Sequence, residues 1–264
     1  MERAHDRVQS VERALAVLRL LAEEGVPLRL SDVQRKTGLQ KSIAFRLLKT
    51  LEASRFVEQD AGGGGFRIGI AAFEIAQAYP RGGSLIRLVR PYLRTLVAGS
   101  PHTAYLAALD GFEIVYLASV EGAGPLRVHV RAGQRRPAYA TAVGKALLAE
   151  LPGAEVAALA RSGGLLPLTP ATITSVPKLV KHVRDVRRRG YAVNFEEAYL
   201  GIGAIAATVR DGTGSAVAGI SLAYATSLLP PKELPAWIER GRAMVLEVSA
   251  ALGGVMVDDG EFAA

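Results

Sequence analysis

The stretch SDVQRKTGLQKSIAFRLLKTL, residues 31–51, decides how the N-terminal part of this chain folds. Ser31 followed by Gln34 has the spacing of a capping box, which predicts that a helix opens at Ser31. Gly38 favours a turn, so this helix ends there and a second helix is expected over residues 41–52. Two helices joined by a tight glycine turn form the core of a helix-turn-helix.

Basic residues dominate this helix pair. Between Val33 and Leu51 the sequence has five cations and no acid. The cations are Arg35, Lys36, Lys41, Arg46 and Lys49. On a helical wheel the second helix divides into two arcs, of which the apolar one is expected to pack inward. The apolar arc contains Ile43, Ala44, Leu47 and Leu51, and the polar arc contains Lys41, Ser42, Phe45, Arg46 and Lys49.

The polar arc suits the major groove of double-stranded DNA. Arg46 or Lys41 can donate to guanine edges, and Ser42 can bond to a base or a phosphate, while Phe45 can meet a thymine methyl group. A solvated helix face is the alternative, but a phenyl ring among cations is an unusual choice for bare solvent. The helix pair is therefore predicted to contact DNA through Arg35, Lys36, Gln40, Lys41, Ser42, Phe45, Arg46 and Lys49.

The flanking sequence completes a winged helix-turn-helix. Val11, Leu15, Leu18 and Leu21 recur at helical spacing and predict a first helix that ends at Gly25. Two short strands, residues 56–59 and 66–68, flank a four-glycine tip and predict a hairpin. Arg67 on its return strand is a further candidate contact to phosphate or the minor groove, with a plain surface role as an equal alternative.

The rest of the sequence predicts a sheet covered by helices, an α+β arrangement. Asp110-Gly111 and the sequence DGTG at 211–214 mark two hairpins. Strands are expected at residues 103–109, 112–120, 126–131, 204–210 and 216–224. Helices are expected at residues 71–79, 85–97, 142–151, 178–189 and 235–252. The predicted domains are a winged helix-turn-helix over 1–69, a linker helix and joint over 70–84, and an effector domain over 85–264.

Composition excludes several classes of protein. The 264 residues are 50% hydrophobic, carry a net charge of +7 and include no cysteine, so disulfides, thiolate metal sites and cysteine nucleophiles are excluded. The four histidines are scattered, so neither a metal site nor a catalytic triad is expected, and no cofactor is predicted. No signal peptide and no membrane span is predicted, which favours the cytoplasm.

The motifs resemble those of IclR-type bacterial transcription regulators. In the N-terminal half these are SVERALAVLRLLAE, TGLQKSIAFRLLKTLEASRFVEQD and FRIG. In the C-terminal half they are YATAVGKALLAEL, residues 139–151, and GYAVNFEEAYLGIGAIAATVRD, residues 190–211. The resemblance implies a winged helix joined by a linker helix to a GAF-like domain. It also implies a homodimer or dimer of dimers, a pseudo-palindromic operator and a small organic-acid effector.

The resemblance also implies an effector site. In the family, a loop before the GKALLA helix holds a ligand carboxylate through backbone N–H groups, which here belong to Ala142 and Val143. An acid is more usual than Asn194, and Ala204 and Ala223 replace residues that are often Cys or Ser. The pocket is therefore less polar than in relatives that bind small oxo-acids, which favours a bulkier, aromatic acid. The implied site residues are Tyr139, Ala142, Val143, Asn194, Ala204, Ser221 and Ala223.

Alternatives stay open for some of these residues and for the function as a whole. Ala204 and Ala223 are equally well explained as small core residues, and Glu197, which matches the family's signature glutamate, as a surface carboxylate. The sequence GISLA, residues 219–223, mimics part of a nucleophile elbow, so a hydrolase that uses Ser221 is the alternative function, although catalysis is not the prediction. A ligand-binding or partner-binding protein whose winged domain no longer binds DNA is the third class.

Overall fold

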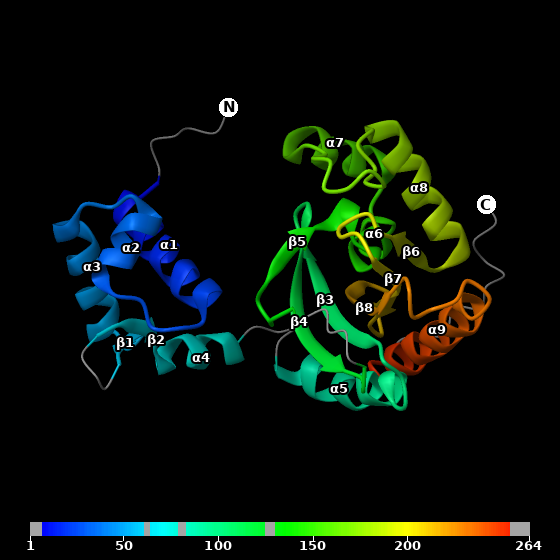
Figure 1. Ribbon diagram of the computed structural model, residues 1–264, viewed down its shortest axis with the longest axis horizontal. Coiled ribbons are helices and arrows are strands. Elements are labelled where there is room, and N and C mark those ends of the chain that lie inside the picture. Colours follow the sequence, from blue (N-terminus) through cyan, green and yellow to red (C-terminus); the bar gives the residue numbers. More distant parts are fainter. Residues whose placement is uncertain (1–6, 61–63, 79–82, 125–129, 254–264) are drawn as a thin grey trace. The chain divides into compact units, whose positions relative to one another are not determined.

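The computed structural model describes residues 7–60, 64–78, 83–124 and 130–253. The chain divides into two compact units, Met1–Gly83 and Ser84–Ala264. The first contains the predicted helices and hairpin, and the second contains a helix-covered antiparallel sheet, so the predicted α+β fold class is confirmed (Figure 1).

Within its described residues the first unit has four helices and a two-stranded wing. Its helices are α1 (Gln9–Glu24), α2 (Leu30–Thr37), α3 (Lys41–Ala53) and α4 (Ile70–Gln77), and its strands are β1 (Val57–Gln59) and β2 (Phe66–Ile68). Both α1 and α2 end at a glycine with positive φ, 64° at Gly25 and 70° at Gly38, as a left-handed helix cap requires. The strands pair antiparallel, with Glu58 opposite Arg67. Two of the four glycines of the predicted tip, those at 62 and 63, lie outside the described residues.

The predicted capping box at Ser31 is wrong. Helix α2 begins one residue earlier, with Arg29 as its N-cap and no side-chain cap. Leu28 forms an isolated bridge to Phe66 with both backbone hydrogen bonds, and this bridge holds the chain against the wing directly before the helix starts. A tertiary contact therefore sets the helix start, and Ser31 lies inside the first turn.

The apolar face predicted for α1 is only partly correct. Val11 and Leu15 are 53% and 49% exposed, whereas Val17 and Leu21 are buried in the core of the unit. The C-terminal half of α1 makes the packing contacts, so the buried stripe is rotated from the one expected. The exposed apolar residues of the N-terminal half follow the helical period but do not reach this core.

The second unit is a six-stranded antiparallel sheet with helices on both faces. Its strand order is β5-β4-β3-β8-β7-β6. The strands are β3 (Thr103–Asp110), β4 (Glu113–Glu121), β5 (Arg135–Pro137), β6 (Ala192–Phe195), β7 (Ile202–Arg210) and β8 (Ala216–Ala225). The helices are α5 (Gly83–Val97), α6 (Ala142–Leu148), α7 (Gly153–Gly163), α8 (Val176–Arg189) and α9 (Leu234–Ala251), with a short 3-10 turn, η1, at Ala138–Ala140.

Alternation along the strands builds two separate cores. On β8, Ile220 and Leu222 belong to the core under α5 and α9, whereas Ala223 belongs to the core under α6 and α8. Both predicted hairpins, β3–β4 and β7–β8, are confirmed. The curled sheet thus separates the two helix layers (Figure 1).

Several predicted boundaries in this unit differ from the structure. The strand expected at 126–131 falls mostly outside the described residues, and Val130 and Arg131 lie in no strand. Helix α6 ends at Leu148 rather than at residue 151, because the Arg187 side chain donates to the backbone carbonyls of Ala149 and Leu151 and holds the chain that leaves the helix. Strands β5 and β6 and helix α7 were not predicted, since their sequences are short or carry weak periodicity.

Candidate functional site

Helix α3 presents the face that the sequence predicts for DNA. The side chains of Lys41, Ser42, Phe45, Arg46 and Lys49 are all exposed, and so is Gln40 directly before the helix. Phe45 is 46% exposed although it is a large apolar residue. On the opposite side Ala44 and Leu48 are fully buried, with Ile43, Leu47 and Leu51 half-buried around them. The two arcs of the helical wheel are therefore present.

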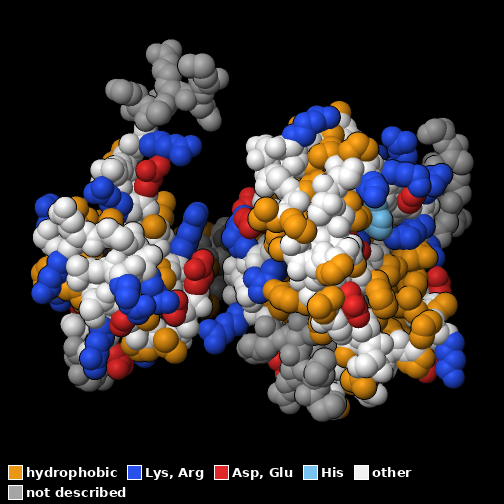
Figure 2. Space-filling model, turned by 45° about the horizontal axis from the view of Figure 1, so that its top comes forward, with side chains coloured by type: hydrophobic (Ala, Val, Ile, Leu, Met, Phe, Trp, Pro, Cys, Tyr) orange, Lys and Arg blue, Asp and Glu red, His pale blue; other side chains and the backbone are white. Residues whose placement is uncertain are grey.

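Acidic side chains neutralise most of the surrounding cations, which the sequence did not reveal. Four ion pairs tie up predicted contact residues: Arg35–Asp32 at 3.0 Å, Lys36–Glu24 at 2.6 Å, Lys49–Glu52 at 2.7 Å and Arg67–Glu58 at 2.7 Å. Figure 2 shows red acidic side chains among the blue basic ones of this unit. Within the described residues, Lys41 and Arg46 have no acidic partner.

The acid-free stretch is thus not acid-free in three dimensions. Glu24 reaches Lys36 from the end of α1, and Glu58 reaches Arg67 across the wing. Exposed pairs of this kind contribute only about 0–1 kcal/mol to stability, so DNA phosphates can compete for the cations. The unpaired Lys41 and Arg46 are available without that competition.

In the second unit, the strands bring the implied effector residues onto one face of the sheet. Asn194 on β6 lies opposite Ala204 on β7, which lies opposite Ala223 on β8. Ser221 is two residues from Ala223 and so points to the same side. Directly opposite residues in an antiparallel sheet share a face, and here that face packs under α6. We call Asn194, Ala204, Ser221 and Ala223 the small-residue row.

Backbone donors lie beside this row, at the turn from η1 into α6. Thr141 caps α6 by accepting a hydrogen bond from the Gly144 N–H at 3.1 Å. The two N–H groups between Thr141 and Gly144, those of Ala142 and Val143, have no acceptor in the described part of the chain. Both residues are buried. The turn therefore offers two adjacent amides to an anionic group.

Two of the implied polar residues are already engaged by the protein itself. The Tyr139 hydroxyl donates to the Leu166 carbonyl at 3.0 Å, and its ring stacks on Phe112 at 5.5 Å. Asn194 donates to the Ala140 carbonyl at 2.5 Å and accepts from the Glu197 N–H at 3.0 Å. The Tyr139 bond holds the η1 turn to the loop after α7, and the Asn194 bonds hold it to β6 and the segment after β6. Ser221 is then the one hydroxyl of the small-residue row.

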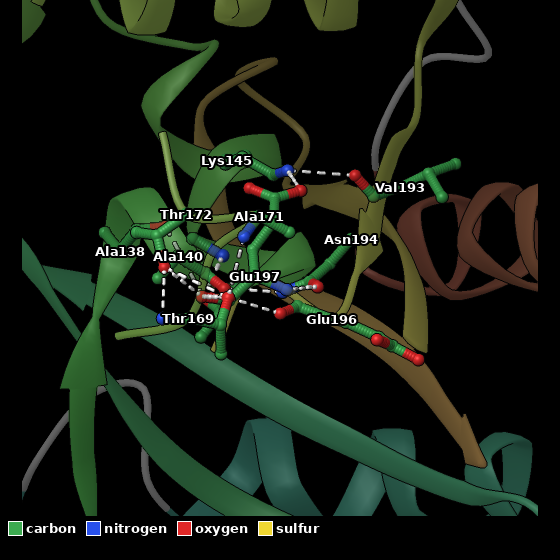
Figure 3. Close-up of polar contacts among 12 residues, drawn as sticks. Ala138, Ala140, Lys145, Thr169, Ala171, Thr172, Val193, Asn194, Glu196 and Glu197 are labelled. Carbon is green, nitrogen blue, oxygen red and sulfur yellow. Dashed lines mark hydrogen bonds and ion pairs between the residues drawn. The ribbon is translucent and has the colours of Figure 1, made fainter. Parts of the chain in front are cut away.

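A buried ion pair between Lys145 and Glu197 lies next to the Asn194 hydrogen bonds. Glu197 was identified from the sequence, but Lys145 was not. The Lys145 side chain is fully buried on α6, donates to the Val193 carbonyl at 2.9 Å and pairs with Oε1 of Glu197 (Figure 3). Glu197 is 8% exposed, so the interpretation of Glu197 as a surface carboxylate is wrong. A lone lysine within the apolar helix around Gly144 was the available signal for its partner.

Burial opposes the charges of both partners. Desolvation raises the pKa of Glu197 and lowers the pKa of Lys145, in each case against the attraction between the two groups. Oε2 of Glu197 is buried and has no hydrogen-bond partner among the described residues. An ion pair that is this strongly desolvated contributes little net stability, so its effect is to fix geometry.

Two threonines fasten the segment that carries Glu197. Thr169 donates to the Glu196 carbonyl at 2.6 Å, and Thr172 donates to the Glu197 carbonyl at 2.7 Å (Figure 3). Glu196 has a positive φ of 57°, uncommon for a residue with a side chain, and its carboxylate accepts from Thr226 at 2.7 Å. The segment after β6 is therefore held at both its backbone and its side chains.

The geometry does not support the hydrolase alternative. Ser221 lies in the middle of β8, paired with Tyr105 on one side and Ala206 on the other. A nucleophile elbow needs a sharp strand-to-helix turn at the serine.

Among the described residues no group of His, Asp and Glu could hold a metal ion, and no helix is long and apolar enough to cross a membrane.

A separate hollow lies on the other face of the sheet. It opens between α9 and the strands and is lined by residues that include Leu96, Ile205, Ile238 and Arg242. Its walls are largely aliphatic, and it contains none of the residues of the small-residue row. We therefore do not assign the effector site to it.

Replacing Lys145 alone should destabilise the second unit. Lys145→Met leaves the Glu197 carboxylate buried without a counter-charge, which typically costs about 3–5 kcal/mol. Lys145→Met combined with Glu197→Leu removes both charges, so at least half of that loss should return. Urea unfolding measures the free energy of unfolding of the single and the double variant. Lys181→Met, on the exposed face of α8, is the control and should leave that free energy nearly unchanged. Equal losses in the single and double variants would contradict this assignment.

Comparisons with known proteins agree with both units. The bacterial transcriptional regulator IclR C-terminal domain matches residues 77–250, and the IclR helix-turn-helix domain matches residues 10–61. The transcriptional repressor AllR of Klebsiella pneumoniae is 35% identical over 250 residues, 95% of this chain and 92% of that protein. AllR of Escherichia coli K12 is 33% identical with the same coverage.

Solved structures show the same architecture. An IclR regulator from Alicyclobacillus acidocaldarius superposes with a TM-score of 0.79 at 27% identity, over 94% of this chain and 100% of that one. The IclR protein of Thermotoga maritima gives 0.73 at 26% identity, over 94% and 100%. Since a family domain covers most of this chain and its relatives are regulators rather than enzymes, the chain belongs to the IclR family of bacterial transcriptional regulators.

Proposed function

We propose that this regulator is a ligand-responsive repressor that binds a pseudo-palindromic operator through α3. The observation that carries the proposal is the exposed face of α3, where Lys41 and Arg46 are unpaired beside Phe45. The AllR relatives are named repressors, which favours repression over activation. A homodimer or dimer of dimers would place two such helices in successive major grooves.

We further propose that the effector is an organic acid held between the η1–α6 turn and the small-residue row. The free N–H groups of Ala142 and Val143 would donate hydrogen bonds to its carboxylate. Since Asn194 is engaged by Ala140 and Glu197, the row offers Ser221 and methyl groups to the rest of the ligand. Such a wall favours a bulkier, aromatic acid over a two-carbon oxo-acid.

The effector would act by shifting the population between arrangements of the winged units. A coupling free energy of about 1–3 kcal/mol is enough to change operator occupancy usefully. Helix α4, in the linker segment, is the element expected to carry the coupling. Fluorescence anisotropy tests the whole proposal, using the upstream intergenic DNA of the chain's own gene against a scrambled duplex, with a panel of acids that includes 4-hydroxybenzoate.

Arg46→Ala should weaken binding to the upstream duplex and relax the preference over scrambled DNA. Loss of one base contact typically costs about 1–3 kcal/mol, or roughly 5–150-fold in affinity. Arg19→Ala, an exposed change of equal charge on α1, should weaken both duplexes alike. If Arg46→Ala kept full discrimination, Arg46 would not be a base contact.

Glu58→Gln should strengthen binding to both duplexes to a similar degree. The change releases Arg67 from its 2.7 Å ion pair and removes a negative charge near the phosphates, so the salt dependence should steepen by about one counterion. Glu74→Gln on α4 is the matched change of charge in the same unit. Equal gains from both variants would show that net charge, not the Glu58–Arg67 pair, limits the wing.

Ser221→Leu should abolish the response to the effector while DNA binding remains. Ser221 is 4% exposed, and a leucine there would fill the space beside Ala206 and Tyr105. Anisotropy with the acid that moves the wild-type chain measures the response, and thermal unfolding confirms that the variant is folded. Ser162→Leu, an exposed change on α7, is the control. A full response in Ser221→Leu would place the effector elsewhere.

A further inference from the structure

Helix α8 carries most of the net charge of the chain. Its 14 residues include six cations and one acid, a net charge of +5 against +7 for all 264 residues. Leu179, Val183 and Val186 are buried in the core shared with α6 and α7, and the opposite side of the helix faces outward. His182 adds no charge near neutral pH, because burial, with Lys145 and Arg189 nearby, lowers its pKa to about 4.

The outward cations are not neutralised in the way that those of the winged unit are. Lys178, Lys181, Arg184 and Arg188 are exposed. Asp185 serves two of them, Arg188 at 2.5 Å and Lys181 at 3.9 Å, and the other two have no acidic partner in the described residues. Figure 2 shows the resulting concentration of blue side chains over this part of the second unit. We call these four residues the α8 basic face.

Helix stability does not account for this arrangement. Like charges three or four residues apart, such as Lys181 and Arg184 or Arg184 and Arg188, destabilise a helix by about 0.2–0.5 kcal/mol per pair. Cations in the last turn are favoured by the helix dipole, but Lys178 lies in the first turn, where a cation is disfavoured. An anionic partner would relieve both effects.

The chemistry of the face favours phosphates over a protein partner. Protein interfaces have an apolar centre with aromatic anchors, and no large apolar residue of α8 is exposed. Long cationic side chains without apolar anchors are typical of sequence-independent contacts to a nucleic-acid backbone. A regulator that is bound to its operator also holds DNA at high local concentration, which favours such a second contact.

We propose that the α8 basic face is a second DNA-binding surface that contacts the phosphate backbone independently of sequence. This inference rests on the proposed function, because the winged unit must first bring DNA to the protein. Its effect is to add affinity and salt dependence without adding discrimination between sequences.

The test is a triple variant of the full chain, Lys181→Gln, Arg184→Gln and Arg188→Gln, measured by anisotropy on a long random-sequence duplex across a salt series. Each lost phosphate contact reduces the slope of log affinity against log salt by about 0.9, so a reduction of roughly 2–3 is expected. The matched control is Arg87→Gln, Arg90→Gln and Arg94→Gln, three exposed arginines on α5 at the same spacing. Thermal unfolding confirms that both variants are folded.

The inference is supported if the α8 variant loses at least ten-fold in affinity and its salt slope falls by roughly 2–3. The α5 variant should lose much less affinity and slope. Equal losses in the two variants would overturn it, because bulk charge would then explain the binding. An unchanged DNA affinity in the α8 variant would also overturn the inference. In that case binding of poly-glutamate is measured as well, and its loss in the α8 variant would assign the face to an acidic protein partner. A wild-type chain that binds no duplex at all would instead contradict the proposed function.

Discussion

The buried contact between Lys145 and Glu197 constrains the whole second unit. It joins α6 to the segment after β6, and Asn194 and the two threonines reinforce the same junction. Because both charges are desolvated, neither partner tolerates displacement into the apolar core around it. These contacts fix the η1–α6 turn relative to the small-residue row, as the proposed effector site would require.

The two units handle positive charge in opposite ways. In the winged unit, acids from α1, α2, α3 and β1 neutralise four of the cations around the recognition helix and leave Lys41 and Arg46 unpaired. On the α8 basic face Asp185 pairs with only two of the four cations, Lys181 and Arg188. If α3 reads bases as proposed, the low local charge around it favours discrimination over general attraction to DNA, whereas the proposed role of α8 is to contact DNA independently of sequence.

Small residues are as important to the second unit as polar ones. Alanines at 204 and 223 present only methyl groups from the sheet toward α6, and the N–H groups of Ala142 and Val143 have no acceptor among the described residues. The row is mostly apolar in effect, because the Asn194 amide is engaged by Ala140 and Glu197.

Local sequence determined the helix-turn-helix, both long hairpins and the two arcs of α3, because periodicity, Gly38 and Asp110-Gly111 act over a few residues. The family resemblance supplied the GAF-like sheet. The tertiary structure alone decided the start of α2, through the bridge from Leu28 to Phe66, and the burial of Lys145 and Glu197, which lie 52 residues apart. It alone also brought Glu24 to Lys36, because ion pairs between elements depend on packing that no local pattern encodes.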